Sequence, residues 1–137
     1  MPKKITVDEY LAKVTKTKVI DIAEKYDEEC FDMDLAWNLY YDIAEILKEG
    51  KFRPVLDFSN VTKIHSYFLV ISIGQYVAKY KERTNLLIGI FGLSKKNMNL
   101  LNFIAKEAIL NGKEILNGLQ DSWNQEDLSS GSDSSIS

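Results

Sequence analysis

The chain has 137 residues, a length that suits one domain with a single hydrophobic core. Its 17 basic and 20 acidic residues give a net charge of −3, which argues against a dedicated nucleic-acid-binding protein. One cysteine and one histidine exclude an intramolecular disulfide and the zinc sites built from several such side chains. We find neither an apolar run of the ~20 residues that span a membrane nor a signal-peptide pattern, so we expect a cytoplasmic protein without a metal.

The charges are distributed unevenly along the chain. Residues 19–50 carry ten acidic residues against two lysines, whereas residues 51–99 carry eight basic residues against two acidic ones. This separation is typical of solvent-exposed helix faces. It is also compatible with head-to-tail self-association into a homo-oligomer, or with a charged partner.

The first 31 residues predict a short helix followed by a strand. Thr6, with Glu9 three positions later, matches a capping box and predicts a helix from Val7 to about Lys16. Residues 19–23 contain β-branched side chains that favour a strand. Residues 26–31 are acidic and predict a loop or a hairpin.

A long helix is predicted next, over residues 33–49. Asp32 is a favoured N-cap residue, and Gly50 marks the end of the helix. Asp42, Glu45 and Glu49 are expected to face water. The apolar residues recur at helical spacing and predict one buried face, made of Leu35, Ala36, Leu39, Ile43, Ile46 and Leu47.

Residues 55–58 predict a short interior strand with Pro54 at its first position, where the missing N–H is tolerated. A polar connection follows over residues 59–63. From Ser66 to about Lys81 the pattern becomes helical. Its predicted buried face consists of Leu69, Ile73, Tyr76, Val77 and Tyr80.

Residues 86–91 form a continuous apolar run, which predicts a strand covered on both faces. Gly92 marks a close backbone approach or the end of this strand, as does Gly89. Ser94 is then expected to cap a last helix that runs to about Asn111 and ends at Gly112. Met98, Leu101, Ala105 and Ala108 are expected to point inward in this helix.

The alternation of strands and helices predicts an α/β fold, with a small mixed sheet of about four strands and helices packed on it. We assign residues 1–18 to an N-terminal extension and residues 19–119 to the domain. Residues 120–137 are rich in serine and acidic residues, so we expect a disordered tail, in which Trp123 is the one side chain suited to docking.

Two segments resemble the central signature of STAS domains, the family named for sulfate transporters and anti-sigma-factor antagonists. They are Val55-Leu-Asp-Phe-Ser-Asn-Val61 and Ile64-His-Ser-Tyr-Phe-Leu69, and the later segment 88–95 resembles the next strand of the family. The resemblance covers roughly residues 19–110 and is closest to a STAS-like subgroup of unknown function. It implies a small cytoplasmic module that is not an enzyme and that binds a protein partner.

In the antagonist branch of that family, a GHKL-type ATPase and serine kinase binds the module and phosphorylates the serine that follows an aspartate. The matching serine here is Ser66, so the resemblance implies a phosphorylation candidate at this position. The chain departs from the family pattern beside it, with His65 for the aspartate, Tyr67 for the second hydroxyl residue and Phe68 for the glycine. The expected partner-binding residues are Asp57, Ser59, Asn60, His65, Ser66 and Tyr67.

Elementary chemistry leaves alternatives open at these residues. A helix N-terminus at Ser66 stabilises a phosphoryl group or an acidic partner, yet a serine there also serves simply as an N-cap. Asp57, at the carboxyl end of a strand, is either part of a ligand site or the acceptor of the following turn. His65 and Ser66 do not predict a hydrolase, because adjacent side chains at a helix start point in different directions.

A second group of residues combines lysines and an arginine with aromatic side chains. Basic and aromatic residues together are typical of single-strand binding. At the end of a helix, however, basic residues also complement the helix dipole while tyrosines pack, and we favour this interpretation. The group consists of Tyr76, Lys79, Tyr80, Lys81 and Arg83.

Three functional hypotheses follow. The first is a non-enzymatic STAS-like interaction module in partner switching or signalling regulation, which docks a partner through residues 59–67 and needs no cofactor. The second is a small-ligand or nucleotide-binding sensor that uses a pocket beside Asp57, although no glycine-rich phosphate loop is found. The third is a phage-type inhibitor that uses the same fold to bind a protein.

Overall fold

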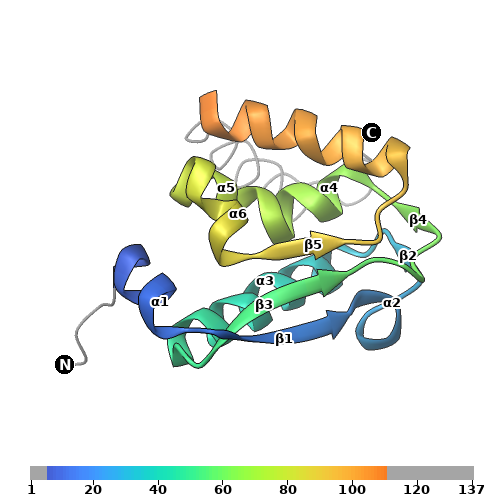
Figure 1. Cartoon of the computed structure of the whole chain (residues 1–137). Helices are drawn as coiled ribbons and strands as arrows, with labels where there is room; N and C mark the ends of the chain where they lie inside the picture. The colour runs from blue at the N-terminus through green and yellow to red at the C-terminus, as the bar shows by residue number, and fades with distance from the viewer. Residues whose placement is uncertain (1–5, 111–137) are drawn as a thin grey trace, which may run out of the picture.

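The computed structural model describes residues 6–110, which form an α/β fold with helices packed on parallel strands (Figure 1). No helix in this range is long and apolar enough to cross a membrane. In chain order the elements are α1 (Val7–Lys13), β1 (Lys16–Asp21), α2 (Ile22–Lys25), β2 (Glu29–Cys30), α3 (Met33–Glu49), β3 (Phe52–Asp57), β4 (Lys63–Ile64), α4 (Ser66–Leu69), the π-helix η1 (Val70–Gly74), α5 (Gln75–Tyr80), the 3₁₀-helix η2 (Lys81–Arg83), α6 (Thr84–Leu87), β5 (Gly89–Phe91) and a last helix over residues 95–110.

The strands form two separate parallel sheets rather than the mixed sheet of about four strands that the sequence predicts. The main sheet has the order β1-β3-β5, with β3 in the centre. The second sheet pairs the short strands β2 and β4. Within the described residues, every strand pair is therefore parallel.

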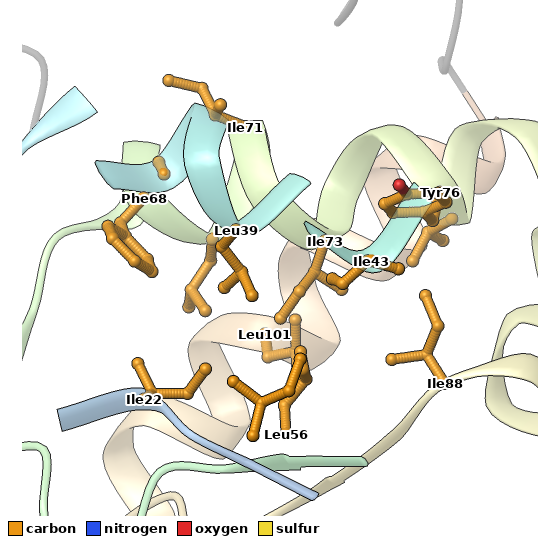
Figure 2. Packing of buried hydrophobic residues seen from close by; sticks show 14 of the residues in the cluster. Ile22, Leu39, Ile43, Leu56, Phe68, Ile71, Ile73, Tyr76, Ile88 and Leu101 are labelled. Atoms are coloured by element: carbon orange, nitrogen blue, oxygen red, sulfur yellow. The ribbon is translucent and has the colours of Figure 1, made fainter. Parts of the chain in front are cut away.

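The core lies on one face of the main sheet. Leu56 of β3 is fully buried, and its register partners Ile20 of β1 and Ile90 of β5 share its face. Figure 2 shows Leu39 of α3 and Leu101 of the last helix among the side chains that gather over Leu56. The opposite face is open, since Val19 is 57% and Phe91 45% exposed. The prediction that the strand at residues 86–91 is covered on both faces is therefore wrong.

Most of the predictions for α3, its two ends and its buried face, are confirmed. The Asp32 side chain accepts hydrogen bonds from the backbone N–H groups of Asp34 and Leu35, and Gly50 ends the helix in the left-handed conformation. Asp42 differs from the expectation, because it accepts a hydrogen bond from the Tyr26 hydroxyl and pairs with a lysine instead of only facing water. Of the predicted face, Ala36, Leu39, Ile43 and Ile46 are buried, while Leu35 and Leu47 are half-buried.

The predicted helix over residues 66–81 is present as the continuous run α4, η1 and α5. Its middle turn is a π-helix that contains Val70, Ile71 and Ile73, and the buried Ser72 hydroxyl donates to the Phe68 carbonyl at 2.6 Å. The side chains expected on the buried face, Leu69, Ile73, Tyr76 and Val77, are buried, and Tyr80 is half-buried.

The boundaries of the strands in the main sheet differ from the predictions. Strand β1 covers Lys16–Asp21 instead of residues 19–23, because Asp21 caps α2 and ends the strand. Strand β3 begins before Pro54, which is tolerated inside it because β5 pairs with β3 only from Val55 onward. The apolar run at residues 86–91 is divided between α6 and β5.

The two ends of the described region are helical, as predicted. Thr6 accepts a hydrogen bond from Glu9 N–H at the start of α1, which ends at Lys13, and the buried Tyr10 donates its hydroxyl to the Phe52 carbonyl. Ser94 accepts from Asn97 N–H at 3.2 Å and caps the last helix. Leu101 and Ala108 of this helix are buried, and Met98 and Ala105 are half-buried. The predicted helix end at Gly112 and the predicted tail lie outside the described residues.

Candidate functional site

The connection between β3 and α4 is held in place by the second sheet. Strands β2 and β4 pair Glu29 with Lys63 and Cys30 with Ile64. The backbone N–H of His65 donates to the Cys30 carbonyl at 3.1 Å, so the pairing extends to the residue before α4. The segment that leads into α3 and the segment that leads into α4 therefore lie side by side.

His65, and not Ser66, caps α4. The backbone of His65 is extended, and its Nδ1 atom accepts a hydrogen bond from the Tyr67 N–H at 3.1 Å. Ser66 is the first residue of the helix and is half-buried. The interpretation of Ser66 as an N-cap is therefore wrong, although its position at the start of the helix is as predicted. Histidine is not among the favoured N-cap residues, so its role as the cap could not be predicted from the sequence.

Three aromatic rings gather beside Ser66. The rings of His65 and Tyr67 stack with centroids 5.8 Å apart and an interplanar angle of 20°. Phe31 meets His65 edge-on, with centroids 6.3 Å apart, and it is 52% exposed. We call Phe31, His65 and Tyr67 the aromatic trio. Phe31 was not among the predicted site residues, because only the pairing of β2 with β4 brings it to His65.

Asp57 acts as the acceptor of the turn that follows β3. Its Oδ1 atom accepts a hydrogen bond from the backbone N–H of Ser59 at 2.8 Å. The hydroxyl of Ser59, and to a lesser extent its N–H, holds the pKa of Asp57 below its ordinary value. Ser59 and Asn60 are exposed at the tip of this turn. Two roles were predicted for Asp57, part of a ligand site or acceptor of the turn. Among the described residues, the hydrogen bond from Ser59 supports the role of turn acceptor.

The turn after β3 is fixed from the other side by the end of β5. The backbone N–H of Phe58 donates to the Phe91 carbonyl at 2.9 Å. Gly92 has a φ of 85°, and a Cβ atom on it would lie 2.5 Å from the backbone nitrogen of Ser59. The sequence-based expectation of a close backbone approach at Gly92 is confirmed. The six predicted site residues thus lie in one connection, with Asp57, Ser59 and Asn60 in its first turn and His65, Ser66 and Tyr67 at its end.

The titratable groups near this connection do not include an activated thiol. Cys30 is buried, and desolvation together with the Asp27 carboxylate raises the pKa of its thiol to about 12. A thiol with such a pKa stays protonated at neutral pH and is a poor nucleophile. Within residues 6–110, no group of three or more histidine, cysteine, aspartate or glutamate side chains is arranged to hold a metal ion.

Comparison of the chain with protein families, with curated proteins and with solved structures finds no match. Functional proposals for this chain therefore rest on its own sequence and geometry.

Proposed function

We propose that this chain is a non-enzymatic, STAS-like interaction module that binds a protein partner in partner switching or signalling regulation. It does so through the surface formed at the start of α4, which we call the docking surface. The observation that carries the proposal is the aromatic trio beside Ser66, in which Phe31 is exposed and His65 and Tyr67 are half-buried. The docking surface consists of Phe31, Asp57, Ser59, Asn60, His65, Ser66 and Tyr67.

The aromatic trio has the properties of an interface anchor. Aromatic side chains dominate the binding energy of protein interfaces, because they bury a large area at a small cost in conformational entropy. The backbone beneath the trio is tied to β2 by the pairing with β4 and by the hydrogen bond from His65 to Cys30. Because these segments are already ordered, little further ordering is needed when a partner binds.

Ser66 gives this surface a means of regulation. A serine kinase of the GHKL type would transfer the γ-phosphoryl group of ATP to the Ser66 oxygen and release ADP and a proton. The phosphoryl group would add about two negative charges next to the aromatic trio. The adjoining segment also carries Asp32, whereas Glu29 of that segment is already paired with Lys63 at 3.8 Å. Docking of an acidic partner surface would therefore weaken after phosphorylation.

The test is a binding titration of the full chain with a GHKL-type ATPase encoded in its gene neighbourhood. Phe31→Ala and Tyr67→Ala are expected to weaken binding at least tenfold, a typical hot-spot effect of about 1.4 kcal/mol or more. Phe103→Ala is the matched control, because Phe103 is another exposed aromatic residue, 62% exposed, on the last helix. Equal losses for Phe31→Ala and Phe103→Ala would contradict the proposed surface.

The regulatory role of Ser66 is tested separately. Incubation with the kinase and ATP is expected to add one phosphoryl group, located at Ser66 by mass spectrometry. Ser66→Asp is expected to bind the partner more weakly than Ser66→Ala. Equal affinities of the two variants would contradict regulation at Ser66 without contradicting the docking surface. A thermal shift of the full chain with ATP, ADP or GTP alone, abolished by Asp57→Ala, would instead favour a nucleotide sensor.

A further inference from the structure

Helices α3 and α5 meet through a continuous series of aromatic rings, which is separate from the docking surface. The ring centroids of Tyr40 and Tyr76 lie 4.9 Å apart, and the Tyr76 hydroxyl donates a hydrogen bond to the backbone carbonyl of Tyr40 at 2.6 Å. Tyr76 is buried in the core, as Figure 2 shows. The expectation that the tyrosines of the basic and aromatic group pack is confirmed for Tyr76.

The series continues to the surface on both helices. On α3, Trp37 stacks on Tyr41 with centroids 5.9 Å apart, and Tyr41 is 57% exposed. On α5, the half-buried Tyr80 stacks on Tyr76, and Lys79 Nζ lies 5.2 Å from the centre of the Tyr80 ring. We call Trp37, Tyr40, Tyr41, Tyr76 and Tyr80 the aromatic belt.

The two sides of the aromatic belt differ in charge. On α3, the exposed charged residues one or two turns from Tyr41 are two acidic ones, Asp34 and Glu45, and one basic one, Lys48. On the α5 side, Lys79 and Lys81 are exposed together with one acidic residue, Glu82, whereas Arg83 is already paired with Asp8. An acidic occupant of the belt would therefore direct its carboxylates toward α5.

The chain itself contains a segment with the matching chemistry. Residues 111–137 carry five acidic residues and one lysine, a net charge of −4, whereas residues 51–110 carry nine basic and three acidic residues, a net charge of +6. Trp123 is the only aromatic residue of the segment, and the acidic residues Asp121, Glu126 and Asp127 surround it in sequence.

The last described helix lies beside η1, which leads into α5 and its belt residues Tyr76 and Tyr80. The last helix packs on η1, where Ile104 Cγ2 is 3.5 Å from the position that a Cβ atom on Gly74 would take. Figure 1 shows the C-terminal end of this helix, in orange, beside α5. The 13 residues from Leu110 to Trp123 reach up to about 45 Å when extended. This reach exceeds what is needed to cross a domain of this size.

We propose that residues 111–137 dock on the aromatic belt of the same chain, with Trp123 against the exposed ring of Tyr41 and its neighbouring carboxylates toward Lys79 and Lys81. A tryptophan buries about 150–250 Å² when it packs on other rings. Because the segment is covalently attached, its effective concentration at the belt is in the millimolar range. A contact of modest intrinsic affinity is then enough to keep the segment docked.

The test uses tryptophan fluorescence in the full chain. Trp37→Phe keeps an aromatic ring in the belt and leaves Trp123 as the only tryptophan. The reference is a free peptide of residues 111–137. Compared with this peptide, Trp123 in the Trp37→Phe chain is expected to emit at a shorter wavelength. Its quenching by acrylamide is expected to be at least twofold weaker. Adding Tyr41→Ser or Lys79→Glu is expected to move both values toward those of the peptide. The effect of Lys79→Glu should shrink at high salt.

Phe103→Ser is the matched control, because it removes an exposed aromatic residue from the last helix and leaves the belt intact. It is expected to leave Trp123 unchanged. A second variant avoids any change to the folded region: Trp123→Ala should alter the emission and quenching of Trp37. The proposal is overturned if acrylamide quenches Trp123 as strongly as in the peptide, or if Phe103→Ser alone raises the quenching of Trp123. It is also overturned if the protection of Trp123 from acrylamide disappears on dilution, because docking would then take place between two copies of the chain.

Discussion

Gly92 lies where the end of β5 meets the turn after β3. Its φ of 85° is unfavourable for residues with a side chain, and a Cβ atom would lie 2.5 Å from both the nitrogen and the Oγ of Ser59. We therefore expect Gly92→Ala to lower the free energy of unfolding by about 1–3 kcal/mol, measured by urea denaturation.

Gly74 provides the control for this prediction. It lies in η1, where an added Cβ atom would make only ordinary contacts of 3.5–3.7 Å. Alanine is favoured over glycine inside a helix, so Gly74→Ala is expected to keep the stability or raise it by up to about 1 kcal/mol. Equal destabilisation by the two substitutions would show that the close approach at Gly92 is not the cause.

A second prediction for single residues concerns the pKa of Asp57 and its dependence on Ser59. The Ser59 hydroxyl is the largest cause of the lowered pKa of Asp57. Ser59→Ala is therefore expected to raise the pKa of Asp57 part of the way toward its ordinary value, because the Ser59 backbone N–H still donates to the carboxylate. The measurement is an NMR titration of the Asp57 carboxyl carbon, with Thr6→Ala, at the cap of α1, as the control.

The sign of the pH dependence follows from the lowered pKa. The hydrogen bonds from Ser59 favour ionised Asp57, so they stabilise the fold fully above the ordinary pKa of an aspartate, near pH 4. This stabilisation is lost as the pH falls through the lower pKa of the folded state. The difference in stability between Ser59→Ala and the unchanged chain should therefore narrow in acid, and a constant difference would contradict this role of Asp57.

At the scale of elements, the start of α4 depends on His65. Its Nδ1 atom accepts the hydrogen bond that caps the helix, while its ring stacks on Tyr67. His65→Ala removes both interactions, and loss of a helix cap costs about 0.5–2 kcal/mol. His65→Asp supplies a favoured cap without a ring, so it is expected to recover most of the stability in thermal unfolding. It should not recover partner binding, and recovery of both would show that the stack contributes nothing to docking.

The elements that the sequence predicted best are those whose ends are marked by local signals. Asp32 and Gly50 bound α3 as expected, and Ser94 caps the last helix. The start of β5 was missed, because a short apolar run has the same pattern in a strand and in a buried helical turn. Here Leu86 and Leu87 belong to α6.

The site was predictable to the extent that it lies in one stretch of sequence. Ser66, His65 and Tyr67 were placed together correctly, because they are neighbours at the start of a helix. Phe31 was not, because two strands of two residues each carry no pattern, and their pairing depends on the tertiary fold. The π-turn η1 was also not predicted, since its residues fit the spacing of an ordinary helix.

At the scale of the whole molecule, the question is whether the docking surface is as stable as the core beneath it. Cys30 can report this, because it is the only cysteine, lies in β2 and is fully buried. Its thiol donates to the Asp27 carbonyl, and burial raises its pKa to about 12, so reaction with a thiol reagent requires an opening of the structure.

We expect the labelling of Cys30 in the full chain to be slow at neutral pH and to accelerate with urea in parallel with global unfolding. This follows because Cys30 belongs to the same buried cluster as Leu39 and Leu56. The measurement is the rate of reaction with a chromogenic disulfide reagent, calibrated on the chain unfolded in urea. A fast rate that does not change at low urea would mean that β2 and β4 separate while the core stays folded. The aromatic trio would then be ordered only when a partner binds, and the cost of this ordering would lower the affinity for the partner.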